Sequence, residues 1–128
     1  MRLGYLLAAC AAALGGVVTA AAQDSADDAA RLANGKQVYD HWCAPCHGPG
    51  LGLPGFGALP GTQQLGIKYR DTDIPAVLDE RIDLVPEFIE VTVRQGVSFM
   101  PQFRKTEISD GDLDALAAWL TRNNRNVR

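Results

Sequence analysis

The sequence is poor in the residues that bind metal ions or form covalent links to cofactors. In 128 residues it has two histidines, three cysteines and two methionines. Met1 and Cys10 belong to an apolar N-terminal stretch. Thiol attachment of a cofactor, or metal binding through nitrogen or sulfur, in the rest of the chain must therefore use a small set of side chains: His41, Cys43, Cys46, His47 and Met100.

The chain also lacks an excess of basic residues and a strand-like pattern. Its formal net charge is −3, which gives no electrostatic footprint for nucleic acid. No segment alternates apolar and polar residues over the length of a strand, and no repeat is present. The length argues for one domain. The sequence therefore predicts a single all-α domain with long loops and no nucleic-acid partner.

The N-terminal 22 residues have the pattern of a secretory signal peptide. Met1-Arg2 gives a positive start, and residues 3–18 are almost wholly Ala, Leu, Gly and Val. Ala20-Ala21-Ala22, followed by polar Gln23, is typical of a signal-peptidase site. We therefore expect a signal peptide at 1–22, a folded domain at 23–128, and export to the periplasm.

Two alternatives concern the same stretch. A retained membrane helix is disfavoured because the stretch is Ala-rich, barely long enough to span, and lacks a charged stop-transfer flank. A lipoprotein box at Leu7-Ala8-Ala9-Cys10 would leave almost no apolar stretch before the cysteine. The sequence predicts no membrane span once the signal is removed.

Helical spacing and capping signals predict the elements of the domain. Apolar residues at steps of three and four indicate a helix from about Ala26 into the cysteine pair, after a capping box at Ser25. Residues 48–61 are rich in glycine and proline and predict an apolar loop, while 62–73 are ambiguous. Further helices are expected over 74–81, from Pro86 to Gly96, and from a Ser109 cap to near Asn123.

The segment Cys43-Ala44-Pro45-Cys46-His47 carries the chemistry. Two thiols three residues apart can each add to one vinyl group of a haem, and the histidine that follows can reach the iron. The sequence predicts one covalent haem on Cys43 and Cys46, with His47 as an axial ligand. The long apolar loops favour this reading, because they need a large apolar ligand to lie against.

Two other interpretations of the motif are open. Trp-Cys-x-Pro-Cys is also the pattern of a thioredoxin-like thiol oxidoreductase, but that fold has a strand before the motif and a helix after it. Here a predicted helix precedes and a glycine-rich loop follows. A zinc site would need two further ligands, and His41 and His47 are the only histidines. His41 is expected to be a solvated surface residue.

The remaining haem contacts are expected from the loops. Met100 is the only thioether left after Met1, and it lies on a loop before Pro101. His/Met ligation would raise the reduction potential and leave no open site for dioxygen. The second ring nitrogen of His47 is expected to donate to a carbonyl, for which Pro60 is the preferred candidate and Pro54 the alternative. Candidate donors to the propionates are Tyr69 and Arg70, with Lys68, Arg81, Gln64 and Trp119 as further ones.

These residues resemble class I cytochromes c over nearly all of residues 23–128. The resemblance rests on the Cys43–His47 motif, Met100-Pro101 and the terminal helices. In that family a glycine and an aromatic residue before the motif, here Gly35 and Tyr39, pack on a pair in the last helix, here Leu116 and Trp119. It implies an all-α fold whose N- and C-terminal helices pack together while loops wrap the haem.

Three stretches give a narrower resemblance, to the cytochrome subunit of 4-cresol dehydrogenase (p-cresol methylhydroxylase) and of eugenol hydroxylases. They are 65–69, 75–81 and 96–109. In those flavocytochromes a flavoprotein oxidises a para-alkylphenol, and the cytochrome passes single electrons to a soluble acceptor. The resemblance implies a flavoprotein (FAD) dehydrogenase partner, and an acceptor such as a blue-copper protein or another cytochrome. It implies no enzymatic activity of the chain on its own.

The residues themselves leave two electron-transfer roles open. A subunit docked on a flavin dehydrogenase should expose apolar side chains near the haem edge, for which Phe99, Phe103 and Leu53 are candidates. A free carrier between respiratory complexes should have a charged ring there. Arg104 and Lys105 lie close to Met100 in sequence, so the sequence alone does not decide between the two.

Overall fold

The computed structural model describes residues 9–127, with side chains from residue 22 onward. The chain divides into two units, Met1–Arg31 and Leu32–Arg128. The division falls within the first helix, α1 (Ala9–Val38). Among the described residues, no helix combines the length and the apolar character needed to cross a membrane.

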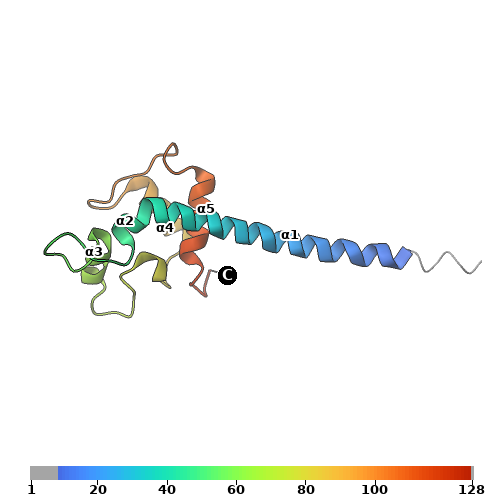
Figure 1. Ribbon diagram of the computed structural model, residues 1–128, viewed down its shortest axis with the longest axis horizontal. Helices are drawn as coiled ribbons and strands as arrows, with labels where there is room; N and C mark the ends of the chain where they lie inside the picture. Colours follow the sequence, from blue (N-terminus) through green and yellow to red (C-terminus); the bar gives the residue numbers. More distant parts are fainter. Residues whose placement is uncertain (1–8, 128) are drawn as a thin grey trace, which may run out of the picture. The chain divides into compact units, whose positions relative to one another are not determined.

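The described part of the first unit is helical throughout (Figure 1). The predicted helix start near Ala26 is wrong, because alanine has the highest helix propensity and carries the helix back to Ala9. The Ser25 hydroxyl donates to the carbonyl of Ala22 at 3.0 Å instead of capping a helix. Residues 1–8, with the positive start of the signal peptide, lie outside the described residues. The signal peptide at 1–22 stays a prediction.

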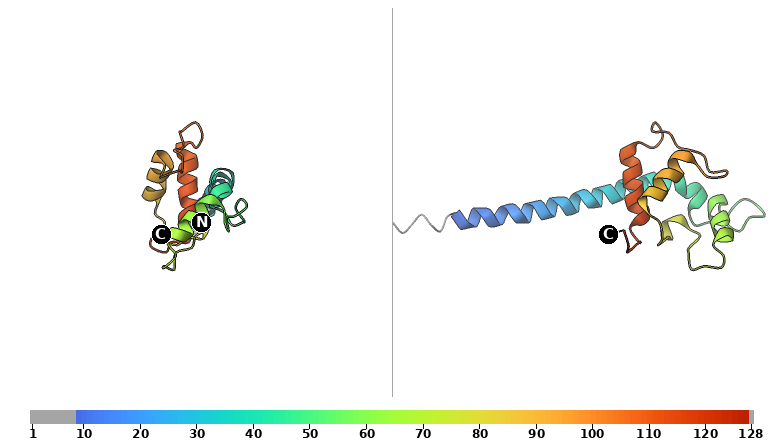
Figure 2. Two further views of the ribbon diagram at one scale, coloured as in Figure 1. Left: turned by 90° about the vertical axis from the view of Figure 1, so that its left-hand side faces the viewer. Right: turned by 180° about the vertical axis from the view of Figure 1, so that it is seen from behind.

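The second unit confirms the all-α fold. After α1 come a π-helical segment, η1 (Tyr39–Cys43), and the short α2 (Ala44–His47). Then follow α3 (Pro60–Lys68), the 3-10 turn η2 (Leu78–Glu80), α4 (Pro86–Gln95) and α5 (Asp110–Thr121). The described residues contain no strand, only one isolated bridge between Val97 and Met100. Figure 2 shows α3 beside the loop that connects it to α2.

The core lies where α5 crosses the last turns of α1 (Figure 1). A Cβ on Gly35 would lie 2.0 Å from the backbone oxygen of Ala115 and 2.9 Å from Cβ of Trp119. Only glycine allows the two helices to approach so closely. Tyr39 and Leu116 are buried in the same cluster. The predicted packing of the terminal helices is therefore confirmed.

Three of the predicted helix boundaries are confirmed. The Ser109 side chain accepts from the backbone N–H of Asp112 at 3.1 Å and starts α5. Pro86 is the first residue of α4, and Gly96, with φ of 71°, follows its end.

Two other segments differ from the prediction. The expected helix over 74–81 is reduced to the 3-10 turn η2. Residues 60–68, which fell partly in the expected loop, form α3. Pro60 supplies a favourable first helical position there, a signal that the surrounding glycines and prolines hide.

Candidate haem site

The two cysteines of the motif lie at the junction of η1 and α2. Cys43 is 7% exposed and belongs to the core cluster, whereas Cys46 is exposed. Both thiols are free. Burial raises the pKa of the Cys43 thiol to about 12. Single-turn π segments are common at functional sites, and here one ends at Cys43 and carries its side chain into the core.

His47 ends α2 and packs against the start of α3. A Cβ on Gly61 would lie 2.5 Å from Cε1 of the imidazole and 2.6 Å from Nδ1. The Thr62 hydroxyl donates to the carbonyl of Gly48 at 2.8 Å, and the Tyr39 hydroxyl donates to the carbonyl of His47 at 3.3 Å. Burial lowers the pKa of His47, which favours the neutral imidazole. These contacts fix the segment that carries the imidazole.

The second ring nitrogen of His47 is a buried polar atom with no partner. Nδ1 makes no hydrogen bond in the described structure. Pro60, the predicted acceptor, is the first residue of α3 and directly precedes the Gly61 that touches the ring. The structure thus brings Pro60 next to His47 without forming the predicted bond. The roles of Gly61 and Thr62 were not predicted, because a lone glycine and threonine after a loop carry no distinctive pattern.

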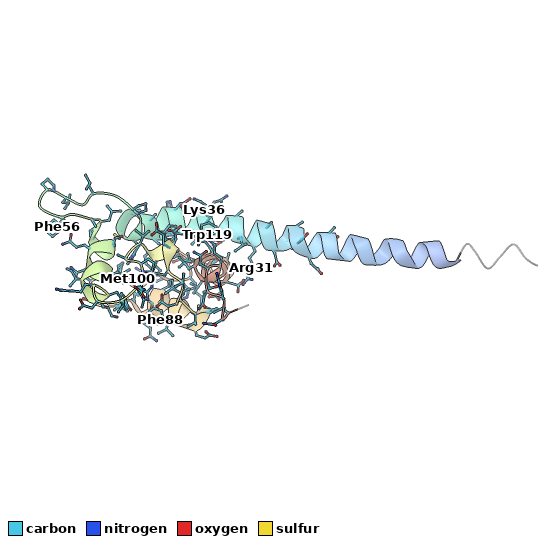
Figure 3. All side chains as sticks on the ribbon, turned by 90° about the horizontal axis from the view of Figure 1, so that it is seen from below. Arg31, Lys36, Phe56, Phe88, Met100 and Trp119 are labelled. Atoms are coloured by element: carbon cyan, nitrogen blue, oxygen red, sulfur yellow. The ribbon has the colours of Figure 1, made fainter. Side chains whose placement is uncertain are left out.

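Met100 closes a tight turn directly after α4. Its N–H donates to the carbonyl of Val97 at 2.9 Å, and the N–H of Val97 donates back to Met100 at 3.2 Å. Farther along, the N–H of Phe103 donates to the Val93 carbonyl at 2.8 Å. Figure 3 shows Met100 on the side of α4 toward α3. The predicted thioether therefore lies on a short segment that is held at both ends.

Arg94 holds the same connection from the side. One guanidinium nitrogen donates to the carbonyls of Phe103 and Ile108, at 3.1 and 2.9 Å, and the other donates to the carboxylate of Asp110 at 2.9 Å. Phe103 packs edge-on against Trp42 with ring centroids 5.6 Å apart. Phe103 is thus partly buried against the core, and of the three apolar candidates for the haem edge only Leu53 and Phe99 are exposed.

The backbone of the Met100 turn is strained at Ser98. Ser98 has φ of 56° and is the only non-glycine residue with positive φ among the described residues. A positive φ at the first central residue alone is the type II′ pattern, in which glycine is preferred.

We expect Ser98→Gly to raise the free energy of unfolding by about 0.5–1 kcal/mol, because relief of the strain exceeds the added entropy of the unfolded chain. Denaturant titration measures this change. Ser98→Ala is the matched control, because it removes the hydroxyl and keeps the Cβ. Equal gains from both variants would assign the effect to the hydroxyl and contradict the strain argument.

A cavity of about 150 Å³ lies between the two loops that flank the motif and Met100. Its lining is mostly apolar and comes from the loop after α2, from α3 and from the Met100 turn: Leu53, Phe56, Ala58, Pro60, Gln63, Gln64 and Phe99. Leu53 is 72% exposed and Phe99 64% exposed. Residues more than 40 positions apart in sequence thus form one apolar rim.

The candidate propionate donors separate into two groups. The Tyr69 ring lies under two cations, with the guanidinium of Arg81 at 4.5 Å and the ammonium of Lys68 at 5.1 Å from its centroid. Hydrogen bonding to Arg81 lowers the pKa of the Tyr69 phenol. Arg81 is buried and pairs with Asp83. Arg70 is exposed, and its Nε donates to the carbonyl of Ile67 at 3.2 Å.

Two candidates lie apart from that group. Gln64 lines the cavity. Trp119 lies on α5, stacked under Arg122 at 3.5 Å with Lys36 at 5.9 Å from its ring centroid (Figure 3). Its indole nitrogen is buried without a hydrogen-bond partner.

The two other readings of the motif find little support in the geometry. The attacking thiol of a thioredoxin-like site is exposed and has a low pKa, whereas Cys43 is buried and its pKa is raised. Among the described residues, no group of three or more His, Cys, Asp or Glu side chains could hold a metal ion. His41 is exposed and lies edge-on against Trp42.

Comparison with known proteins decides the family. The family model described as cytochrome c oxidase, cbb3-type, subunit III, matches residues 30–120. The chain belongs to this family of cytochrome c domains. The cytochrome therefore binds haem c covalently and is an electron-transfer protein rather than a catalyst. No curated protein and no solved structure matched the sequence.

The residues of the cytochrome fit a haem group. The free thiols of Cys43 and Cys46 are available for covalent attachment. A neutral imidazole at His47 and a thioether at Met100 are suitable iron ligands. The unpartnered Nδ1 of His47 suits a residue whose other nitrogen binds a metal, because such a histidine donates its second N–H to a nearby acceptor. The assignment of these four residues to the haem stays a prediction.

Proposed function

We propose that this cytochrome is the electron-transfer subunit of a periplasmic flavocytochrome. It accepts single electrons from a flavoprotein (FAD) subunit that oxidises para-alkylphenols, and it passes them to a soluble acceptor such as a blue-copper protein or another cytochrome. The observation that carries the proposal is the exposed apolar rim of the cavity, formed by Leu53, Phe56 and Phe99. We call it the haem-edge rim, and the cavity the haem-edge cavity. The resemblance of 65–69, 75–81 and 96–109 to cytochromes of such complexes supports it.

Each residue of the site has one role in this proposal. Cys43 and Cys46 would hold the haem through thioether bonds, and His47 and Met100 would ligate its iron. When bound, haem supplies a one-electron couple, and His/Met ligation raises its potential and leaves no position for dioxygen. Gly61 leaves the imidazole room against α3. The Met100 turn carries the thioether, and Arg94 holds the segment that follows the turn through the carbonyls of Phe103 and Ile108.

The charges near Met100 favour a docked subunit over a freely diffusing carrier. A carrier that is steered to several partners needs unpaired charge around the haem edge. Lys105 lies 2.6 Å from the carboxylate of Asp110, which Arg94 also contacts. Of the two basic side chains near Met100 in sequence, Lys105 is thus paired within the domain and Arg104 is exposed, while the apolar rim is open to a protein surface.

Co-purification of the native protein tests the proposal. We expect a flavin-bearing chain to accompany the tagged cytochrome in a fixed ratio, and a para-alkylphenol to reduce the haem of the purified complex. The double variant Leu53→Ser/Phe99→Ser should slow this reduction. Leu51→Ser is the matched control, because Leu51 is 84% exposed and does not line the cavity. A lone monomer at every salt concentration, without phenol-dependent reduction, would instead identify a free carrier.

A further inference from the structure

Helix α4 is apolar on two sides. Its inner side chains, Ile89 and Val93, are both 4% exposed and belong to the core. On its outer side Phe88 and Val91 are each 51% exposed. Positions three apart are neighbours on a helix surface, and Figure 3 shows Phe88 projecting outward from α4. The outer apolar side chains are therefore not buried in the core, and packing within the domain does not explain them.

Exposed apolar residues also precede the helix. Ile82 and Val85 lie in the non-helical segment directly before α4, and both are exposed. Single exposed apolar side chains are normal on a protein surface, but a group of them marks an interaction site. None of the four residues lines the haem-edge cavity. We call Ile82, Val85, Phe88 and Val91 the α4 face.

Acidic side chains border the α4 face. Glu87 precedes Val91 by one helical turn and Glu90 is its chain neighbour, and both are exposed. Neither carboxylate has an ion-pair partner among the described side chains. Between positions 82 and 95 the only basic residue is Arg94, whose guanidinium is occupied by Phe103, Ile108 and Asp110. The border of the face is therefore negative.

The charge pattern indicates which kind of partner can bind the α4 face. A second copy placed symmetrically would bring the same carboxylates together, which like-charge repulsion opposes. A membrane rich in anionic lipid would be repelled in the same way. A protein surface with an apolar patch edged by lysine or arginine complements both features.

The small size of the haem-edge rim indicates that the partner on the α4 face is the same protein that contacts the rim. A stable interface buries about 800 Å² on each partner, whereas transient electron-transfer encounters bury less. The three side chains of the rim are too few for a lasting complex. Gly96 joins α4 directly to the Met100 turn, so the α4 face and Phe99 of the rim belong to one continuous stretch of chain.

We infer that the α4 face is a second docking surface, which holds the cytochrome on the basic-edged apolar patch of its flavoprotein dehydrogenase while the haem-edge rim receives the electron. This inference rests on the proposed function. It assigns affinity to Phe88 and Val91, and the rate of electron transfer to Leu53 and Phe99. Glu87 and Glu90 orient the partner.

The test is a binding titration of the full cytochrome against the flavin-bearing chain recovered with it. Phe88→Ser/Val91→Ser should weaken binding by roughly tenfold for each side chain, with an unchanged haem spectrum as evidence of folding. Glu87→Lys/Glu90→Lys should weaken binding most strongly at low salt. Ile67→Ser is the matched control, because Ile67 is an exposed apolar residue of α3, outside the α4 face.

Each outcome separates the inference from the proposed function. If the Phe88/Val91 variant binds the flavoprotein as tightly as the wild type, and the Leu53/Phe99 variant does not, the inference is overturned and the proposed function stands. A variant that only converts a dimer to a monomer, or only abolishes binding to anionic vesicles, also overturns it by naming another occupant. If no flavin-bearing chain is recovered at all, both the inference and the proposed function are contradicted.

Discussion

Replacement of Gly35 by alanine should destabilise the cytochrome domain by about 1–3 kcal/mol or more, although alanine is normally the better helix former. The new Cβ would lie 2.0 Å from the oxygen of Ala115 and 2.6 Å from its carbonyl carbon. Both neighbours are backbone atoms of α5, so no rotation of a side chain can relieve the overlap. The crossing of α1 and α5 would have to open, and the core around Tyr39 and Leu116 with it.

Denaturant unfolding of the haem-bearing protein measures this effect. Gly111→Ala is the matched control on α5, because a Cβ there would meet only the Ser109 hydroxyl, at 4.0 Å. That variant should be neutral or slightly more stable, since alanine gains helix propensity. If Gly35→Ala unfolds at the same denaturant concentration as the wild type, the close approach of the two helices is wrong.

The predictable parts of the fold are those with strong local signals. The Ser109 cap begins α5, and Pro86 and Gly96 bound α4, because a capping side chain, a fixed φ and a left-handed turn act within a few residues. The extension of α1 to Ala9 was missed because Ser25 resembled a cap, whereas the alanines before it favour continued helix. Helix α3 was missed because it is short and starts inside a segment dense in glycine and proline.

The site was predictable in its chemistry and not in its contacts. The spacing of Cys43, Cys46 and His47 specifies the attachment motif because covalent chemistry depends on neighbours in sequence. The packing of Gly61 on the imidazole and the pairing of Tyr69 with Arg81 are long-range contacts. These contacts form only when the chain folds, so no local sequence pattern predicts them.

The same distinction applies to Met100. The sequence shows that Met100 is a candidate thioether ligand, but it does not show the contacts that hold this residue. The turn closed between Val97 and Met100, the strained Ser98 and the clamp by Arg94 appear only in three dimensions. These contacts hold the methionine on a fixed segment, so a ligand there needs little rearrangement to form.

Met100→Ala should therefore abolish the sulfur-to-iron charge-transfer band and lower the reduction potential, because it removes the thioether without changing the turn. Axial ligands set haem potentials over a range of about 0.8 V, so the expected loss is tens to hundreds of millivolts. Visible absorption and a redox titration of the purified protein measure both. The potential falls because the thioether favours the reduced iron.

Two further variants make the assignment of Met100 specific. Met100→His restores a ligand without sulfur, so the haem should stay six-coordinate while the charge-transfer band is lost. Val97→Ala is the matched control, because Val97 is an exposed residue of the same turn that contributes its backbone to the closing bonds. It should keep the band and the potential. A Met100→Ala protein with the wild-type spectrum would exclude the thioether as a ligand, and with it the predicted iron site without a position for dioxygen.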